Sequence, residues 1–336
     1  MKVVRVSLIF ILLLMTFWFL NVLVSPKYMD SLVEGSMISE YYDTPKNHEV
    51  IFIGDCEVYA NFSPMVFYEE EGSSSYIRGS SQQLIWQSYS ILEETLRYET
   101  PKVVIFNVNA MRYSEPVSEA YNRLTIDKMK WSKEKVEIIR SSMMEEENFL
   151  SYVFPILRYH SRIFELTKED FTYFFQKKTH TFNGFLINQA VNGVKSLPSK
   201  RPLTEDDFAD ITYQYLDKIR LLCEEKGIEL VLIKAPSLYP YWYSEYDEKI
   251  KEYASKYQLD YYNFLENILE INLDYSTDTY DGGLHLNLQG ATKLSKYFAP
   301  ILKEKYSLTD YRENNEVSVY YEKELEKYYE EIGSGV

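Results

Sequence analysis

An uncharged run near the N-terminus, residues 7–24, is the feature that most limits what this chain can become. A run of 18 residues is long enough to cross a bilayer as a helix. Lys2 and Arg5 precede it, so the positive-inside rule places residues 1–6 in the cytoplasm and the rest of the chain outside. The alternative is a cleaved signal peptide, but the run is long for one and lacks an Ala-x-Ala-like site at its end. We therefore predict a single-pass cell-membrane protein, anchored by residues 7–25, with an extracytoplasmic domain.

The composition excludes several classes of protein. A net charge of −15 argues against a nucleic-acid partner, because a phosphate backbone needs a basic surface. Two cysteines cannot form a disulfide framework. The four histidines show no paired metal-ligand spacing, and no glycine-rich phosphate loop follows a strand. We predict no metal and no cofactor.

Short apolar runs alternate with helical patterns through most of the remaining sequence. The runs predict five strands, and the apolar residues between them recur at helical spacing. Such alternation is typical of an α/β fold: a doubly wound parallel five-stranded sheet in three α/β/α layers, flavodoxin-like in its arrangement. The predicted strands are residues 50–55, 75–78, 102–109, 228–234 and 259–264. The predicted helices are residues 62–71, 82–98, 204–226, 244–257 and 288–305.

The same pattern divides the chain into segments. Residues 26–47 lack a sustained pattern and are predicted as a linker, and residues 48–308 as the α/β domain. Residues 111–203 interrupt the alternation after the third strand, and we expect a largely helical insertion packed over one end of the sheet. Residues 309–336 form an acidic tail with an apolar stripe at helical spacing, which we expect to pack on the domain or on a partner.

Two short stretches far apart carry residues suited to catalysis. Gly54-Asp55-Cys56 ends the first strand, and Asp281 precedes His285 just before the last helix of the domain. Ligands of doubly wound sheets bind at the carboxyl ends of the strands, so a thiol nucleophile, an imidazole base and an orienting carboxylate are predicted to meet there. The structural alternatives are a buried thiol, a Cys56–Cys223 disulfide, and a histidine that serves only the fold.

These stretches resemble the conserved blocks of the SGNH/GDSL hydrolase superfamily. Gly54-Asp55-Cys56 is similar to its Gly-Asp-Ser block, and Asp281…His285 is similar to its Asp-x-x-His block. Gly79, after the second strand, resembles the second block, and residues 106–109 resemble the third. The resemblance implies catalysis by Cys56, His285 and Asp281. It further implies an oxyanion hole built from the N–H groups of Cys56 and Gly79 and a side-chain amide of Asn109 or Asn107.

Two departures from the family pattern leave assignments open. Cys56 stands where most members have serine, and Asp281 lies four residues before His285 instead of three. A glycine pair between them can absorb the extra residue, so Asp281 is kept as the orienter and Asp278 is the reserve. We expect the start of a helix to lower the pKa of the Cys56 thiol.

The anchor and the residues after His285 are most similar to the membrane-tethered branch of the superfamily, which includes polysaccharide O-acetyltransferases and teichoic-acid modification proteins. This implies an acyl esterase or O-acyltransferase that acts on ester-linked acyl groups of cell-surface glycans or polymers. A thioester on Cys56 suits transfer to an alcohol, whereas the family default is hydrolysis. Partners would be the acylated carbohydrate or cell-wall polymer and a membrane-bound acyl-donor protein. The alternative is an inactive SGNH-fold binding or assembly protein of a cell-envelope modification system.

Four polar residues are candidates for binding the substrate. Asp55 adjoins the proposed nucleophile, whereas Arg123, Arg158 and His160 lie in the insertion and are expected to reach over the strand ends. For each arginine taken singly, a salt-bridged helix face is the structural alternative.

Overall fold

Five parallel strands form one sheet in the computed structural model, which describes residues 2–29, 32–35, 37–199, 202–203, 205, 207–313 and 315–333. Their order is β2-β1-β3-β4-β5, every neighbouring pair is parallel, and this is the doubly wound order of flavodoxin-like folds. The predicted fold class is therefore confirmed. The strands are β1 (Val50–Ile53), β2 (Ser75–Ile77), β3 (Val103–Asn107), β4 (Glu229–Lys234) and β5 (Asp260–Asn263).

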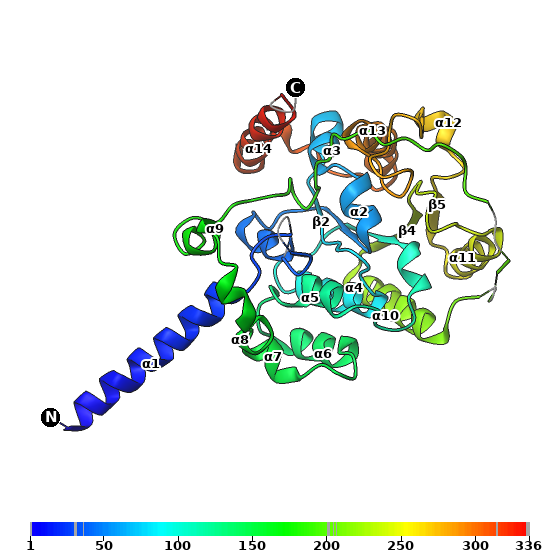
Figure 1. Ribbon diagram of the computed structural model, residues 1–336. Coiled ribbons are helices and arrows are strands. Elements are labelled where there is room, and N and C mark those ends of the chain that lie inside the picture. The colour runs from blue at the N-terminus through cyan, green and yellow to red at the C-terminus, as the bar shows by residue number, and fades with distance from the viewer. Residues whose placement is uncertain are drawn as a thin grey trace.

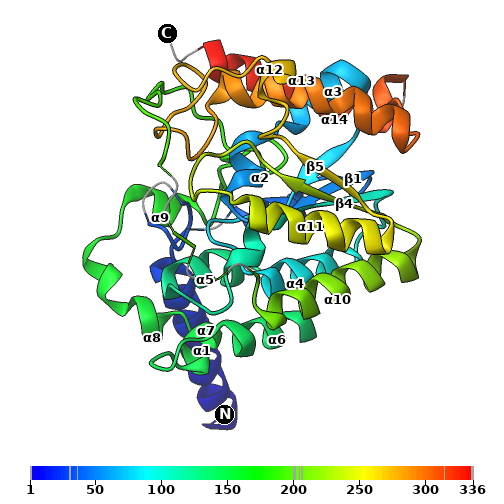
Figure 2. The same cartoon turned by 90° about the vertical axis from the view of Figure 1, so that its right-hand side faces the viewer.

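Helices cover both faces of the sheet, as Figure 2 shows. On one face lie α3 (Pro64–Glu71), α13 (Leu288–Lys305) and α14 (Asn315–Gly333); on the other lie α4 (Ile85–Thr95), α10 (Asp210–Lys226) and α11 (Ser244–Tyr257). Successive strand residues point to opposite faces, so Phe52 joins one apolar core and Ile51 and Ile53 join the other. A central strand buried on both faces must be apolar throughout, which explains the continuous apolar runs.

The remaining helices are shorter, apart from the N-terminal one. They are α1 (Lys2–Val24), η1 (Ile38–Asp43), α2 (Cys56–Asn61), η2 (Val108–Arg112), α5 (Glu119–Ile126), α6 (Lys133–Ser142), α7 (Phe149–Val153), α8 (Ile156–Tyr159), η3 (His160–Phe164), α9 (Lys168–Thr172), α12 (Ile268–Ile271) and η4 (Tyr311–Glu313).

Several predicted element ends differ from the structure, among them the start of α10 and the end of β3. Helix α10 begins at Asp210 and not at residue 204, which lies outside the described residues together with residue 206. Residues 207–209 are not helical, and Phe208 stacks on Tyr246 of α11 with ring centroids 4.8 Å apart. Strand β3 ends at Asn107, so Asn109 lies in the η2 turn and not on the strand.

The insertion after β3 is spread more widely than a cover over one end of the sheet. Its helix α6 packs outside α4, and α7, α8 and α9 lie beside α1 (Figure 1). Residues 186–194 run along the loop that carries His285, where Asn192 N donates to Thr279 O at 2.9 Å and Leu288 N donates to Asn188 O at 2.7 Å. One segment thus contacts both the anchor region and the candidate site.

Helix α1 projects away from the rest of the molecule (Figure 1). Its residues Val3–Val24 have a mean hydropathy of 2.5, so this helix is long and apolar enough to cross a membrane. The predicted linker that follows is partly ordered, because Tyr41 of η1 is fully buried against the ring of Tyr76. At the other end of the chain, α14 carries the predicted apolar stripe, and its residues Tyr321 and Tyr328 are buried.

Candidate active site

The turn after β1 places Cys56 at the carboxyl edge of the sheet. Gly54 has φ 141°, a conformation that favours glycine, and a Cβ there would lie 3.0 Å from Asn107 Cβ. Asp55 then caps α2, because its Oδ1 accepts a hydrogen bond from Glu57 N at 3.2 Å. The chain therefore turns sharply, and Cys56, half-buried, becomes the first residue of α2.

The Asp55 carboxylate is fully buried and accepts hydrogen bonds from two asparagines, one at the end of β3 and one in η2. Asn107 Nδ2 donates to Asp55 Oδ1 at 2.9 Å, and Asn109 Nδ2 donates to Asp55 Oδ2 at 2.5 Å. Asn107 Nδ2 also donates to Glu57 Oε2 at 2.9 Å. Both Asp55 oxygens therefore accept hydrogen bonds within the protein, and these bonds hold the turn of residues 54–56 against the end of β3.

A buried ion pair, which the sequence did not lead us to expect, lies beneath this turn. Lys234 Nζ, at the end of β4, lies 2.8 Å from Glu57 Oε1, and both side chains are almost completely buried. Burial raises the pKa of the Glu57 carboxyl, and Lys234 opposes that rise. The sequence signal is a lysine that ends an apolar strand at the carboxyl edge of the sheet.

The His285 loop closes on the Asp281 carboxylate. His285 Nδ1 lies 2.7 Å from Asp281 Oδ2, and His285 N donates to Asp281 Oδ1 at 2.8 Å. A bridge between Thr279 and Leu286 closes the base of the loop. Asp278, the reserve orienter, is instead bound to Lys293 Nζ at 2.7 Å. The loop thus pairs His285 with Asp281 and directs Asp278 elsewhere.

Two contacts bring the Cys56 helix and the His285 loop together. Asn61, the last residue of α2, accepts a hydrogen bond from Leu286 N at 2.8 Å. The Tyr280 ring stacks on the His285 ring with centroids 5.6 Å apart, and burial and the charges of Asp281 and Cys56 raise the pKa of its hydroxyl. Within the described residues His285 Nε2 is buried and has no hydrogen-bond partner, so none joins it to the Cys56 sulfur.

The surroundings of Cys56 keep its thiol protonated. Burial raises its pKa well above 9.0, and the negative charges of Asp55 and Glu57 raise it further. The Gln82 N–H lowers the pKa by less. The expected lowering by the helix start is therefore wrong: two buried carboxylates flank the sulfur, and α2 is only six residues long. Cys56 and Cys223 are both free thiols, so the disulfide alternative is excluded.

Gly79 lies against the backbone of the turn formed by residues 54–56. A Cβ at this position would lie 2.2 Å from Val58 Cγ2 and 3.0 Å from the carbonyl oxygens of Gly54 and Asp55. Only glycine permits so close an approach. The next residue fixes the loop, because Ser80 N donates to Gly54 O at 3.3 Å. The β2 loop and the β1 turn thus form one edge beside Cys56.

The three insertion residues predicted to bind substrate are not brought to this edge. Arg123 is fully buried, with its guanidinium bonded to Glu119 and Asp127. Arg158 pairs with Glu119 at 2.8 Å, and His160 is exposed in η3 beside α8. Their surroundings are those of a structural helix cluster.

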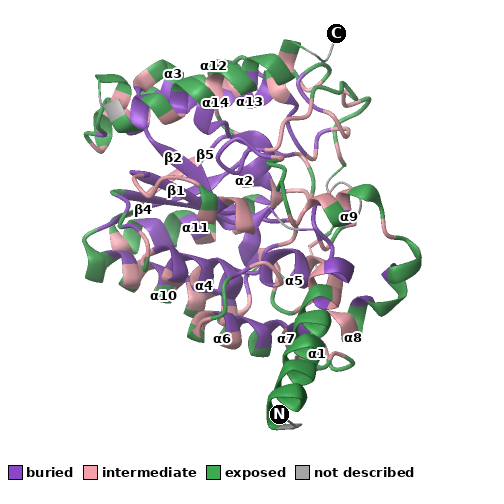
Figure 3. Cartoon of the chain, turned by 90° about the vertical axis from the view of Figure 1, so that its left-hand side faces the viewer, coloured by how far each residue is buried: buried purple, intermediate pink, exposed green. Residues whose placement is uncertain are grey.

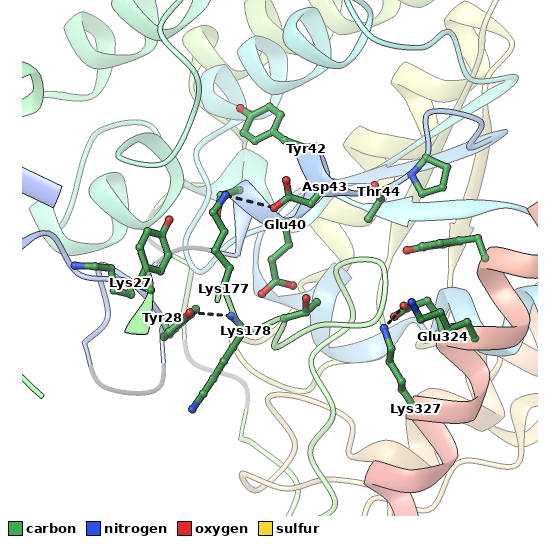
Figure 4. A pocket seen from close by; sticks show the side chains of 16 residues that line it. Lys27, Tyr28, Glu40, Tyr42, Asp43, Thr44, Lys177, Lys178, Glu324 and Lys327 are labelled. Carbon is green, nitrogen blue, oxygen red and sulfur yellow. Dashed lines mark hydrogen bonds and ion pairs between the residues drawn. The ribbon is translucent and has the colours of Figure 1, made fainter. Parts of the chain in front are cut away.

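Two cavities show where a larger ligand has room. One, of about 400 Å³, adjoins the His285 loop, where Leu238 N donates to Gly283 O at 2.8 Å; it is lined by Arg112, Pro198, Ser199, Tyr239, Pro240, Tyr241 and Tyr243. The other, of about 570 Å³, lies between the end of α1 and α14 (Figure 4) and contains none of the predicted site residues. In that cavity Lys177 pairs with Asp43 and Lys327 with Glu324. No group of three or more metal-ligating side chains occurs in the described part of the chain.

No protein-family model and no curated protein matches the chain. Among solved structures it is similar to a protein of Bacteroides fragilis with a provisional assignment as an acylhydrolase (TM-score 0.39, 11% identity, 80% of this chain and 95% of that one). It is also similar to a GDSL-like lipase of Bacteroides thetaiotaomicron (TM-score 0.36, 11% identity, 79% of this chain and 95% of that one). With TM-scores below 0.5, neither likeness carries an inference about activity.

Proposed function

We propose that this protein is a membrane-anchored SGNH-type enzyme that takes an acyl group from an ester onto Cys56 and passes it to an alcohol or to water. The observation that carries the proposal is the His285 side chain: its Nδ1 is bound to Asp281, and its Nε2 is buried without a partner beside the Cys56 helix. A buried polar atom without a partner is costly, and such atoms recur at catalytic sites. A substrate or the thiol itself would satisfy Nε2 during the reaction.

The arrangement supports general-base activation of a neutral thiol. With its proton on Nδ1, facing Asp281, the imidazole presents a lone pair on Nε2. Nε2 takes the Cys56 proton while the sulfur attacks the acyl carbonyl, and the collapse of the tetrahedral intermediate returns that proton to the departing alcohol. The resulting thioester is cleaved by a second alcohol or by water, which His285 activates in the same way. Because the pKa of the Cys56 thiol is raised, the thiol keeps its proton and needs His285 to accept it during the attack.

The hydrogen-bond inventory separates the two candidate asparagines of the oxyanion hole. Each amide nitrogen has two N–H groups. Asn107 uses two, on Asp55 and Glu57, whereas Asn109 uses one, on Asp55. Asn109 therefore retains an N–H for the oxyanion, together with the N–H of Gly79 beside the turn. One such donor is typically worth about 10²–10³ in rate.

The cavity beside the His285 loop supports a carbohydrate acceptor. Tyrosine faces at 239, 241 and 243 present apolar surfaces with polar edges, and Arg112 adds a cation. Aromatic walls with a few polar groups are typical of small-molecule sites. An acylated glycan or cell-wall polymer outside the cell is thus the proposed substrate, with α1 as a retained membrane span.

Intact mass spectrometry of the full chain after incubation with p-nitrophenyl acetate tests the proposal. We expect one acetyl group on the wild type and on Cys223→Ala, and none on Cys56→Ala with an unchanged melting temperature. Cys223 is the matched control because it is the other free thiol. An adduct that persists in Cys56→Ala, or none on the wild type, would refute a Cys56 nucleophile.

A second candidate is an inactive binding or assembly protein with the same fold. The high Cys56 pKa and the missing hydrogen bond to His285 favour it. The pH profile of iodoacetamide labelling distinguishes the two. An active site should label faster in wild type than in His285→Gln at pH 7 to 8, whereas an inert thiol should label at the same slow rate in both, rising only above pH 9.

A further inference from the structure

The helices of the insertion wrap around the point where α1 enters the domain. Phe154, after α7, contacts Phe17 with ring centroids 5.5 Å apart, and Phe174, after α9, stacks on Phe19 at 4.8 Å. Residues 149–175 form this wrapping segment, which we term the collar. Figure 3 shows α7 and α8 beside α1. The collar thus contacts α1 at residues that belong to its apolar, exposed part.

The end of α1 is built into the domain through its backbone groups. Arg162 of the collar donates to Val24 O at 2.6 Å, and Lys27 Nζ donates to Leu23 O at 2.9 Å. Ile156 N donates to the Asn21 side chain at 3.0 Å. The last carbonyls of a helix need such donors. Arg162 of the collar and Lys27 supply donors to these carbonyls, and the collar also binds the Asn21 side chain. The structure is therefore built to keep α1, which favours the membrane span over a cleaved signal peptide.

The outer surface of the collar carries several exposed apolar side chains among exposed polar ones. Phe164 and Phe175 are 92% and 93% exposed, and Leu157 is 54% exposed. Ile163 and Phe171 are also exposed. Single apolar side chains on a surface are ordinary, but several aromatic rings gathered on one short segment indicate an interaction surface.

The length of α1 identifies what covers this surface. From residue 6 to Phe19, the last residue of α1 with an exposed side chain, the helix spans about 21 Å at 1.5 Å per residue. The hydrocarbon layer of a bilayer is about 30 Å thick. Five further residues, 20–24, add about 7 Å, but the collar encloses them. The hydrocarbon can reach its normal thickness only if it extends to the level of the collar.

We infer that the collar is immersed in the outer leaflet and forms a second, monotopic attachment to the membrane that α1 spans. The occupant of the apolar surface is the phospholipid bilayer, because the same acyl chains that cover Phe17 and Phe19 must also meet the collar residues in ring contact with them. Phe164 and Phe175 insert into the boundary between acyl chains and headgroups, as the apolar faces of interfacial helices do.

Photocrosslinking of the full chain in phosphatidylcholine–phosphatidylglycerol vesicles tests this inference. A benzoylphenylalanine replaces Phe164, Phe175 or, as the matched control, Leu269 of α12, which is 94% exposed. All three side chains are exposed, so folding should be unaffected. We expect phospholipid adducts at 164 and 175 at least tenfold above those at 269, detected by mass after digestion.

Three outcomes would overturn the inference. Lipid adducts at 164 and 175 no more frequent than at 269 would place the collar in water. Crosslinks at these positions to a second copy of the chain would make the surface a protein interface. A mature chain that begins after α1 would remove the anchor that holds the collar at the bilayer. None of these outcomes bears on the acyl adduct at Cys56.

Discussion

Two histidine–carboxylate pairs in this protein have almost the same geometry. In one, His285 Nδ1 and N contact the two oxygens of Asp281 at 2.7 and 2.8 Å. In the other, His48 Nδ1 and N contact Glu99 at 3.0 and 2.8 Å. In both pairs Nε2 is buried and without a partner in the described part of the chain. The pair by itself therefore does not identify a catalytic site.

What differs is the place of each pair in the fold. His48 precedes β1, at the amino edge of the sheet, where the rings of Tyr41 and Tyr76 enclose it and Tyr41 donates to Glu99 at 2.7 Å. His285 lies at the carboxyl edge, in a loop tied to the helix that begins with Cys56. Ligands of doubly wound sheets bind at the carboxyl edge. Position relative to the strand ends, and the presence of the Cys56 thiol on the adjoining helix, distinguish the two pairs.

The variant Asp281→Asn tests most directly whether the His285–Asp281 pair is catalytic. The imidazole would lose its preferred tautomer, and we expect turnover to fall about 10⁴-fold, the scale for losing the orienting carboxylate of a triad. The melting temperature should stay close to wild type, because Asp281 is partly exposed. Asp278→Asn is the control and should keep its turnover. The reverse result would transfer the orienting role to Asp278.

A second variant tests whether the buried charges beneath the site are structural. Lys234→Met leaves the Glu57 carboxylate buried without its partner, which typically costs about 3–5 kcal/mol. We expect lower stability in chemical denaturation but turnover within a few-fold of wild type for the folded fraction. Lys234→Met with Glu57→Gln should recover part of the loss. Turnover lost at unchanged stability would make Lys234 a catalytic residue.

Glu99→Gln tests the amino-edge pair. It weakens the hydrogen bonds from His48 and Tyr41, and we expect a loss of about 1–3 kcal/mol in the free energy of unfolding with unchanged turnover. Denaturation and turnover measured on the same preparation give both values. A fall in turnover like that of Asp281→Asn would contradict the distinction between the two pairs.

The pH dependence of stability should show the smallest effect. Burial raises the pKa of Glu99, but hydrogen bonds from His48 and Tyr41 and the charge of His48 outweigh burial and hold the pKa below 4.5. A carboxyl whose pKa is lower in the folded state stabilises the fold above its ordinary pKa and loses that contribution as the pH falls. The stability difference between wild type and Glu99→Gln should shrink as the pH falls from 6 through the ordinary pKa of a glutamate. A difference that grows in acid would reverse the assigned sign.

Local patterns predicted the sheet and part of the site. The bounds of α11 and α13 follow from apolar periodicity and from the Asn287 cap, and Asp281 and His285 are only four residues apart in one loop. Arg123 carries a local signal for the salt-bridged alternative, because Glu119 and Asp127 lie four residues on either side of it. That spacing predicts ion pairs along a helix. The structure contains both of these ion pairs, and they engage the guanidinium that was predicted to bind substrate.

Long-range polar contacts were beyond prediction from one sequence. Glu57 and Lys234 are 177 residues apart, and Asn61 and Leu286 are 225 apart. Hydrophobic periodicity specifies which face of an element is buried but not which polar groups meet across the core. The pKa of Cys56 depends on those unseen neighbours, so the start of α2 was a poor guide to its reactivity.

The rigid junction between α1 and the domain limits how far the domain can move relative to the helix. Because Arg162 and Asn21 fasten the helix end to the collar, the domain cannot swing on a tether as a lipid-linked protein would. In the proposed membrane arrangement, Cys56 stays at one height and in one orientation above the lipid surface. The proposed polymer substrate must then present its ester groups at that height. The fixed distance from the membrane would therefore determine which units along the polymer are modified.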